Sequence, residues 1–148
     1  MILEDPVKKV IVVGVLGVIV AALAAYYFYS DENMPAASGG RGPAIVEVTL
    51  PDHFTPGAMA GKTLYDKNCV SCHGTNAAGQ DGVAPPLIHK IYEPGHHGDG
   101  AFFRAVAQGV RAHHWPFGNM PAIEGLNQTE VALIIRYVRE IQQASGIR

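Results

Sequence analysis

The sequence predicts an all-α protein, in which an N-terminal transmembrane helix is joined by a flexible tether to a small helical domain. Three observations support this prediction. Residues 10–29 carry no charge, three later stretches combine apolar helical spacing with capping residues, and no segment alternates as paired strands would. The 148 residues suit one compact domain with an appendage. The formal net charge of −2 reflects no basic excess, so no nucleic-acid partner is expected.

The uncharged run Val10–Tyr29 has about the length of one helix across a bilayer. Two lysines precede it and acidic residues follow it, so the positive-inside rule predicts a cytoplasmic N-terminus. We interpret residues 1–30 as an anchor in the inner membrane, in contact with lipid through residues 10–29. The rest of the chain is then periplasmic. A cleaved signal peptide is the alternative, because an Ala-Leu-Ala sequence inside the run resembles a cleavage site.

The next segment, residues 31–54, is interpreted as a linker and a short extended stretch. Its first part is rich in small residues and has no periodicity. The helical domain is predicted to cover residues 55–148. Thr55 followed by Pro56 is typical of a helix start, and this first helix is expected to run to about Val70.

Two further helices are predicted in the domain. Asp99 is expected to cap one that ends near Gly109, and Asn127 with Glu130 three residues later resembles a capping box. The last helix is expected to end before Gly146. Its apolar stripe consists of Val131, Ile134, Ile135, Val138 and Ile141.

The chain has two cysteines, Cys69 and Cys72, and His73 follows directly. Two cysteines are too few for a four-cysteine zinc site, a disulfide over this spacing would organise little, and the βαβ surroundings of a thioredoxin-like pair are absent. What remains is the C-x-x-C-H signature of haem attachment, in which both sulfurs form thioethers and the histidine ligates the iron. We therefore expect one covalent haem c.

Four segments resemble the class I c-type cytochromes, in particular short membrane-anchored bacterial ones. They are "GKTLYDKNCVSCHG", "APPL", "GNMP" and "EVALIIRYVREIQ", in that order, and the likeness covers about residues 55–143. The resemblance implies a haem held between N-terminal and C-terminal helices that cross through a small residue and aromatic residues. Gly61, Tyr65 and Tyr137 match that crossing.

The resemblance also implies a methionine as the sixth iron ligand, and Met120 in "GNMP" occupies that place. A thioether favours ferrous iron and fills the last coordination position. We therefore expect a six-coordinate haem that resists carbon monoxide.

Other haem contacts follow from the same resemblance. The carbonyl of Pro85 in "APPL" is expected to accept a hydrogen bond from the proximal histidine, and Leu87 is expected to pack on the haem. Trp115 and Arg111 precede the methionine and are interpreted as donors to the haem propionates.

The sequence departs from the family pattern in a group of histidines. We expect them to be loop residues that are exposed or bonded to propionates and backbone, with no tight copper or zinc binding. Two alternatives stay open, because imidazole is the commonest transition-metal ligand: a second copper or zinc site, or a bis-histidine haem through His113 or His114. The group consists of His89, His96, His97, His113 and His114.

The function implied is a membrane-tethered periplasmic carrier of single electrons in a respiratory or photosynthetic chain, and not an enzyme. The resemblance implies a cytochrome bc complex as donor and a terminal oxidase or periplasmic reductase as acceptor. Two other classes stay open: an electron-relay subunit docked permanently in a membrane oxidoreductase complex, and a haem protein with a second metal site.

Overall fold

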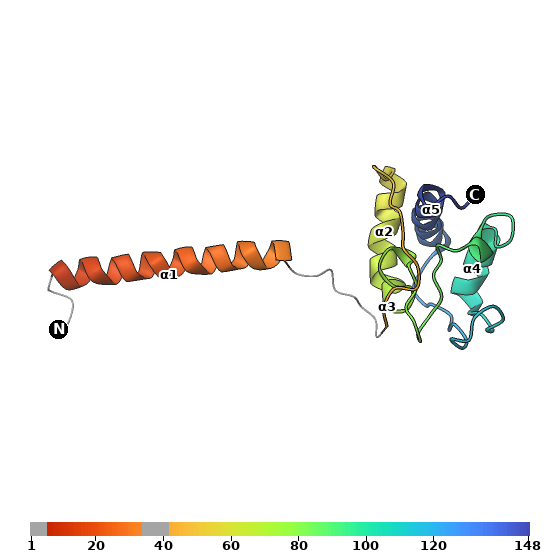
Figure 1. The fold of residues 1–148 in the computed structure, drawn as a ribbon, viewed down its shortest axis with the longest axis horizontal. Helices are drawn as coiled ribbons and strands as arrows, with labels where there is room; N and C mark the ends of the chain where they lie inside the picture. Colours follow the sequence, from red (N-terminus) through yellow and green to blue (C-terminus); the bar gives the residue numbers. More distant parts are fainter. Residues whose placement is uncertain (1–5, 34–41) are drawn as a thin grey trace. The chain divides into compact units, whose positions relative to one another are not determined.

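The computed structural model describes residues 6–33 and 42–148. The chain divides into two units, Met1–Ala37 and Ser38–Arg148, of which the first contains helix α1 and the second all the other helices (Figure 1). The part of the predicted tether that covers residues 34–41 lies outside the described residues.

Helix α1 spans Pro6–Asn33, so it continues into residues 31–33, which were predicted to be linker. Among the described residues, no helix combines the length and the apolar character that a membrane crossing requires. The structure therefore does not support the predicted transmembrane helix at residues 10–29. Many apolar side chains of α1 are exposed, namely those of Val12, Val13, Val15, Leu16, Val18, Ile19, Val20, Leu23 and Tyr26.

The second unit is helical, as predicted. Over the described residues, the only ladder-type pairings are two isolated bridges, Gln80 with Ala84 and Val110 with Met120. Its helices are α2 (Pro56–Asn68), α3 (Val70–His73), the 3₁₀ turns η1 (Thr75–Ala77) and η2 (Lys90–Tyr92), α4 (Asp99–Gln108) and α5 (Gln128–Ala144).

The predicted starts of α2 and α5 are confirmed by their caps. The Thr55 hydroxyl accepts a hydrogen bond from the Ala58 amide at 3.3 Å, directly before proline in the first turn. Asn127 and Glu130 form the reciprocal capping box, because each side chain accepts from the other residue's amide, at 3.0 and 2.9 Å.

The predicted cap of α4 is wrong by one residue. Gly98 occupies the N-cap position, and Asp99 lies in the first helical turn. The Asp99 carboxylate accepts instead from Nε of Arg139 on α5, at 2.9 Å, so it joins α4 to α5. Gly109, with φ of 74°, ends the helix as expected.

The core of the unit lies where α2 crosses α5 (Figure 1). Gly61 permits this approach, because a Cβ there would lie 1.9 Å from the Leu133 carbonyl oxygen. Tyr65 and Tyr137 are fully buried, with ring centroids 5.4 Å apart. The crossing predicted through these three residues is confirmed. The predicted stripe of α5 is also buried, from Val131 to Ile141.

Residues 42–54 belong to the compact unit, which begins earlier than the boundary predicted at residue 55. The amides of Ile45 and Val46 donate to the Ala78 carbonyl at 3.1 and 3.2 Å. Val46 and Phe54 pack against the core, and Thr49 is bonded to the Ser145 hydroxyl at the end of α5. This extended stretch therefore helps to join residues 74–84, the loop that follows the C-x-x-C-H motif and is called the haem-motif loop below, to the C-terminal helix.

Candidate functional site

The two cysteines lie at the junction of α2 and α3. Cys69 ends α2, and its carbonyl accepts from the amides of Cys72 and His73 at 3.1 and 2.9 Å, which makes one tight turn. The two sulfurs do not form a disulfide with each other, and Cys69 is partly buried whereas Cys72 is exposed. Burial and then the neighbouring Cys72 raise the pKa of the Cys69 thiol to about 11. A redox-active pair needs a lowered thiol pKa, so this pair does not fit thiol–disulfide exchange.

The imidazole of His73 is held in one orientation. Its Nδ1 donates to the Pro85 carbonyl at 2.9 Å, which confirms the predicted hydrogen bond. Because a carbonyl only accepts, the proton is on Nδ1, and Nε2 keeps the lone pair that can bind a metal. Burial lowers the pKa of His73, against a smaller opposite effect of the Pro85 bond, so the neutral form is favoured.

The loop after the motif folds back to bring Pro85 to His73. The Gly79 amide donates to the His73 carbonyl at 2.8 Å, and the Leu87 amide donates to Ala77 at 2.9 Å. Gly79 has φ of 74°, and a Cβ there would lie 2.5 Å from the Pro86 nitrogen. Leu87 is partly buried and packs against the hydrophobic core of the unit. Its contact with the haem stays a prediction.

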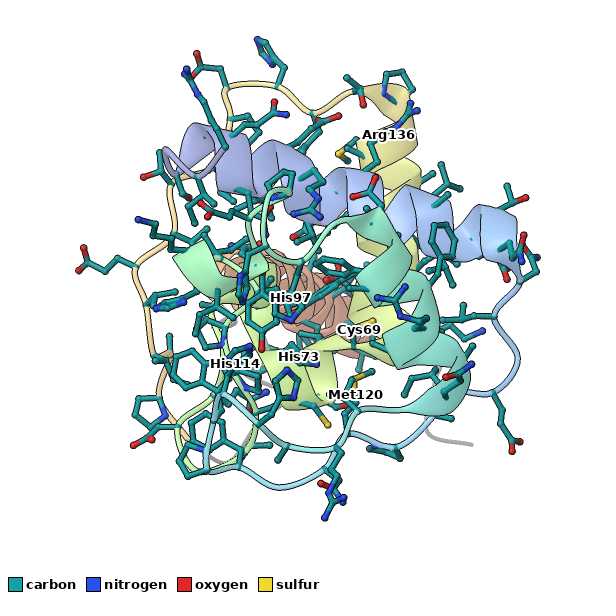
Figure 2. All side chains as sticks on the ribbon, turned by 90° about the vertical axis from the view of Figure 1, so that its right-hand side faces the viewer. Cys69, His73, His97, His114, Met120 and Arg136 are labelled. Carbon is teal, nitrogen blue, oxygen red and sulfur yellow. The ribbon has the colours of Figure 1, made fainter. Side chains whose placement is uncertain are left out.

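Met120 is placed by a small closed loop. Its amide and carbonyl both bond to Val110, at 2.9 Å each, directly after the end of α4. Gly109 makes this closure possible, because a Cβ there would lie 2.5 Å from the Met120 carbonyl oxygen. Figure 2 labels Cys69, His73 and Met120, and in that view they lie in the same part of the domain.

The residues present fit a haem in one further respect. The indole Nε1 of Trp115 is buried and forms no hydrogen bond of good geometry among the described residues, although the Tyr92 hydroxyl lies close: burial raises the pKa of Tyr92, and the Trp115 indole opposes that shift. A buried N–H of this kind is costly unless an acceptor is supplied, and a haem propionate is such an acceptor. Arg111 is exposed, and its carbonyl accepts from Nδ1 of His113 at 2.8 Å. The propionate contacts of both residues stay predictions.

Three of the five singled-out histidines come together. The ligand nitrogens of His96, His97 and His114 all lie within 4.8 Å of one another. Partial desolvation, and then the imidazoles of His113, His97 and His96, lower the pKa of His114. His89 serves elsewhere, because its ring accepts from the Ile91 amide at 3.2 Å and caps η2.

Sequence reasoning missed Arg139 and Gln142 of α5, which fasten the loop that bears His97. The Arg139 guanidinium donates to the carbonyls of Tyr92 and His97 at 2.6 and 2.7 Å. Gln142 is buried and donates to the carbonyls of Leu87 and Tyr92 at 2.8 and 3.1 Å. The sequence contains only one indication of this role, which is that both polar residues directly follow members of the apolar stripe of α5.

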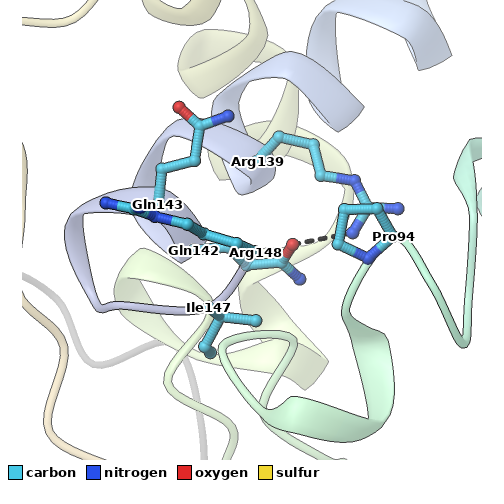
Figure 3. Close-up of a pocket in the computed structure, with 6 residues that line it drawn as sticks. All are labelled: Pro94, Arg139, Gln142, Gln143, Ile147 and Arg148. Carbon is cyan, nitrogen blue, oxygen red and sulfur yellow. Dashed lines mark hydrogen bonds between the residues drawn. The ribbon is translucent and has the colours of Figure 1, made fainter.

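Arg139 and Gln142 also border a shallow pocket of about 410 Å³, in which the arginine donates to Gln142 Oε1 at 2.7 Å (Figure 3). The pocket contains none of the predicted haem ligands. Its lining residues are Pro94, Arg139, Gln142, Gln143, Ile147 and Arg148.

Comparison with known proteins gives a family match over most of the helical domain. The family model described as cytochrome c matches residues 58–142. The cbb3-type cytochrome c oxidase subunit FixP of Bradyrhizobium sp. (strain ORS 278) is 37% identical over 94 residues, which are 62% of this chain and 30% of that protein.

Two further relatives match over shorter stretches. The cbb3-type cytochrome c oxidase subunit CcoP of Azospirillum brasilense is 53% identical over 36 residues, 21% of this chain and 12% of that protein. Cytochrome c-554(547) of Halothiobacillus neapolitanus is 63% identical over 30 residues, 20% of this chain and 32% of that protein. The chain thus spans less than a third of each of these relatives, and no solved structure matches it.

Proposed function

The chain belongs to the cytochrome c family, and from this premise we propose that it carries single electrons to a membrane-bound terminal oxidase. Its cofactor is one haem c, attached through Cys69 and Cys72 of the C-x-x-C-H motif. The observation that carries the proposal is the hydrogen bond from His73 Nδ1 to the Pro85 carbonyl beside that motif. This bond leaves Nε2 as the iron-binding nitrogen and fixes the ring.

Haem c, when bound, supplies an iron that changes between ferrous and ferric states. The chain's part is to keep the ligand set constant, so that little rearrangement accompanies electron transfer. We propose that His73, through Nε2, and Met120, through its thioether, would hold the haem iron. The backbone of Met120 is fixed by its two bonds to Val110, and that of His73 by the turn at Cys69.

A terminal oxidase as electron acceptor is supported by the relatives, two of which are named as subunits of cbb3-type cytochrome c oxidases. A cytochrome bc complex as donor rests on the family resemblance alone. The carrier itself converts no substrate. Rapid mixing of the reduced holoprotein with oxidase-containing membranes should oxidise it within the turnover time of the oxidase.

A permanently docked relay subunit is the second candidate function, and the same two relatives favour it. The chain spans 30% and 12% of those proteins, so most of what they contain has no counterpart in the alignment. Purification from native membranes separates the two candidates. A carrier leaves the oxidase at moderate salt, whereas a subunit stays in stoichiometric amount.

We keep membrane tethering and a periplasmic haem domain as part of the proposal. Their support is the uncharged run at residues 10–29, the preceding lysines and the exposed apolar side chains of α1. Extraction of native membranes with alkaline carbonate decides, because a tethered protein stays in the pellet.

The ligand assignment is tested by Met120→Ala in the holoprotein. Loss of the thioether should lower the reduction potential by on the order of 0.1 V, within the roughly 0.8 V range that axial ligands span. Carbon monoxide should also gain access to the ferrous protein. Met59→Ala is the matched control, since Met59 is half exposed on α2, and it should leave both properties unchanged. An unchanged potential in Met120→Ala would mean that another residue is the sixth ligand.

A further inference from the structure

Three histidine side chains from two separate loops converge in the haem domain. His96 and His97 follow η2, whereas His114 lies in the closed loop between Val110 and Met120. Their ligand nitrogens lie within 4.8 Å of one another, and Figure 2 shows His97 and His114 in one region of the domain. Because His97 and His114 are 17 positions apart in the sequence, their proximity is produced by the fold.

The ring of His97 is prepared for metal binding. Its Nδ1 donates to the Ile91 carbonyl at 2.6 Å, so Nε2 keeps the free lone pair. Metal-ligating histidines usually have such an outer partner, which fixes the tautomer and the plane of the ring. His113, whose ring centroid lies 4.3 Å from that of His114, is held in the same way by the Arg111 carbonyl at 2.8 Å.

Both loops are fastened to the helical scaffold. Arg139 donates to the His97 carbonyl at 2.7 Å and stands 4.9 Å over the Phe102 ring. The other loop is closed by the pair of bonds between Val110 and Met120 and by a bond from the Ala112 amide to Asn119 Oδ1 at 2.9 Å. The three imidazoles are therefore brought together by a supported backbone.

We propose that His96, His97 and His114 form a transition-metal site that binds Cu²⁺, and Zn²⁺ more weakly, with one coordination position open. Three imidazoles without a carboxylate favour these ions over Mg²⁺ or Ca²⁺, and divalent copper is bound most tightly in the first-row series. Ligand nitrogens around one such ion are about 3.4 Å apart at metal–nitrogen distances of about 2.1 Å. His96 and His114 are exposed, so their rings can rotate to close the difference.

The three histidines are distinct from the proposed haem ligands His73 and Met120, although His114 lies in the same loop as Met120, and the metal site does not rest on the proposed electron transfer. A second copper or zinc site was one of the alternatives left open by the sequence. The proposal therefore replaces the expectation that the holoprotein binds neither metal tightly. His113 is available as a fourth ligand through its Nε2, since its Nδ1 is already bonded.

The test is isothermal titration of Cu²⁺ and of Zn²⁺ into the ferric holoprotein, produced as the full chain without a histidine tag. Ferric haem is used so that copper cannot accept an electron from it. We expect one equivalent of either metal, with copper tighter, and nitrogen hyperfine structure in the copper EPR spectrum. His96→Asn and His114→Asn should each weaken copper binding at least tenfold, with the haem spectrum and melting temperature retained.

His53→Asn is the matched control, since His53 is an exposed histidine outside the cluster, and it should leave the isotherm unchanged. The proposal is overturned by the absence of saturable binding to the folded wild-type holoprotein. It is equally overturned if binding survives both cluster variants, or if His53→Asn weakens it as much as they do.

Discussion

The crossing of α2 with α5 and the two site loops, residues 85–97 and 109–121, are held together by different forces. At the crossing, Tyr65 and Tyr137 have no exposed area, and the apolar stripe of α5 is buried beside them. In the site loops most side chains are partly or fully exposed, and backbone hydrogen bonds set the course of the chain. Arg139 and Gln142 of α5 supply the main links from the scaffold to the first loop.

The crossing and the site loops therefore have different roles: the crossing provides most of the stability, and the loops carry the residues proposed to bind the haem and the metal. Burial of apolar area makes the crossing the main source of stability, whereas the loops owe their shape to a few polar contacts. A substitution in a loop can therefore change a ligand or a donor while the scaffold stays folded. The four predictions below measure how far this separation holds.

The largest effect is expected from Gly61→Ala. The added Cβ would lie 1.9 Å from the Leu133 carbonyl oxygen, and backbone of α5 must move to admit it. Overpacking of this kind should cost about 3 kcal/mol of unfolding free energy, measured by urea titration of the holoprotein. Gly95→Ala is the control, since no atom lies within 4 Å of its Cβ position. Equal unfolding free energies of the two variants would mean that α2 and α5 can move apart at little cost.

Arg139→Gln should act on the first site loop and less on the crossing. It removes charge-assisted bonds to the carbonyls of Tyr92 and His97, at an expected cost of about 2 kcal/mol. Hydrogen exchange should show faster exchange in residues 89–98, with α2 still protected. Arg136→Gln, an exposed change on the same helix, should alter neither property. Uniform loss of protection would show that loop and crossing unfold as one unit.

The two core tyrosines link the crossing to the haem-motif loop, and their phenylalanine variants should differ. The Tyr65 hydroxyl donates to the buried Gly74 carbonyl at 2.8 Å, and the Tyr137 hydroxyl donates to Asn76 Oδ1 at 3.1 Å in a partly buried place. Tyr65→Phe leaves a buried carbonyl without its donor and should cost about 2 kcal/mol. Tyr137→Phe should cost about 1 kcal/mol, because water can reach the amide. Thermal unfolding of both variants gives the order, and a reversed order would contradict this account of burial.

The crossing and the site loops also differ in how much of each could be predicted from the sequence. The caps at Thr55 and Asn127 and the stripe of α5 depend on short spacings, and all are found in the structure. The crossing at Gly61 was predicted from the family resemblance, because Gly61 and the α5 carbonyl that it approaches are far apart in the sequence. The bond from His73 to Pro85 was predicted from the family resemblance, because its partners are 12 residues apart without any periodic signal.

Contacts over long sequence separations that the family resemblance does not cover were not predictable. Arg139 meets His97 across 42 residues and Gln142 meets Leu87 across 55, and no local pattern specifies such pairs. The convergence of His96, His97 and His114 has the same cause, since it requires both loops to be in place. The cap of α4 was misplaced because Asp99 has a stronger partner in Arg139 than in its own helix.

The smallest effect on stability is expected from Trp115→Phe, which tests the second site loop. The centroid of the indole ring lies 5.9 Å from that of the stacked Phe117 ring, and the buried indole Nε1 forms no hydrogen bond of good geometry among the described residues. Phenylalanine keeps most of the ring contact and loses only the weak interaction of the indole with the Tyr92 hydroxyl, so the cost should stay below about 1 kcal/mol.

The reduction potential should nevertheless fall in Trp115→Phe, if the indole N–H is the donor to a haem propionate. Without that donor the propionate charge is less neutralised, and it stabilises ferric over ferrous iron. A loss of about 0.5–1 kcal/mol corresponds to roughly 20–40 mV for a one-electron couple. Phe117→Leu, which changes the neighbouring ring and removes no N–H, should leave the potential within error of wild type. Equal shifts in both variants would assign the effect to packing of the loop, and the buried indole would then have no part in tuning the haem.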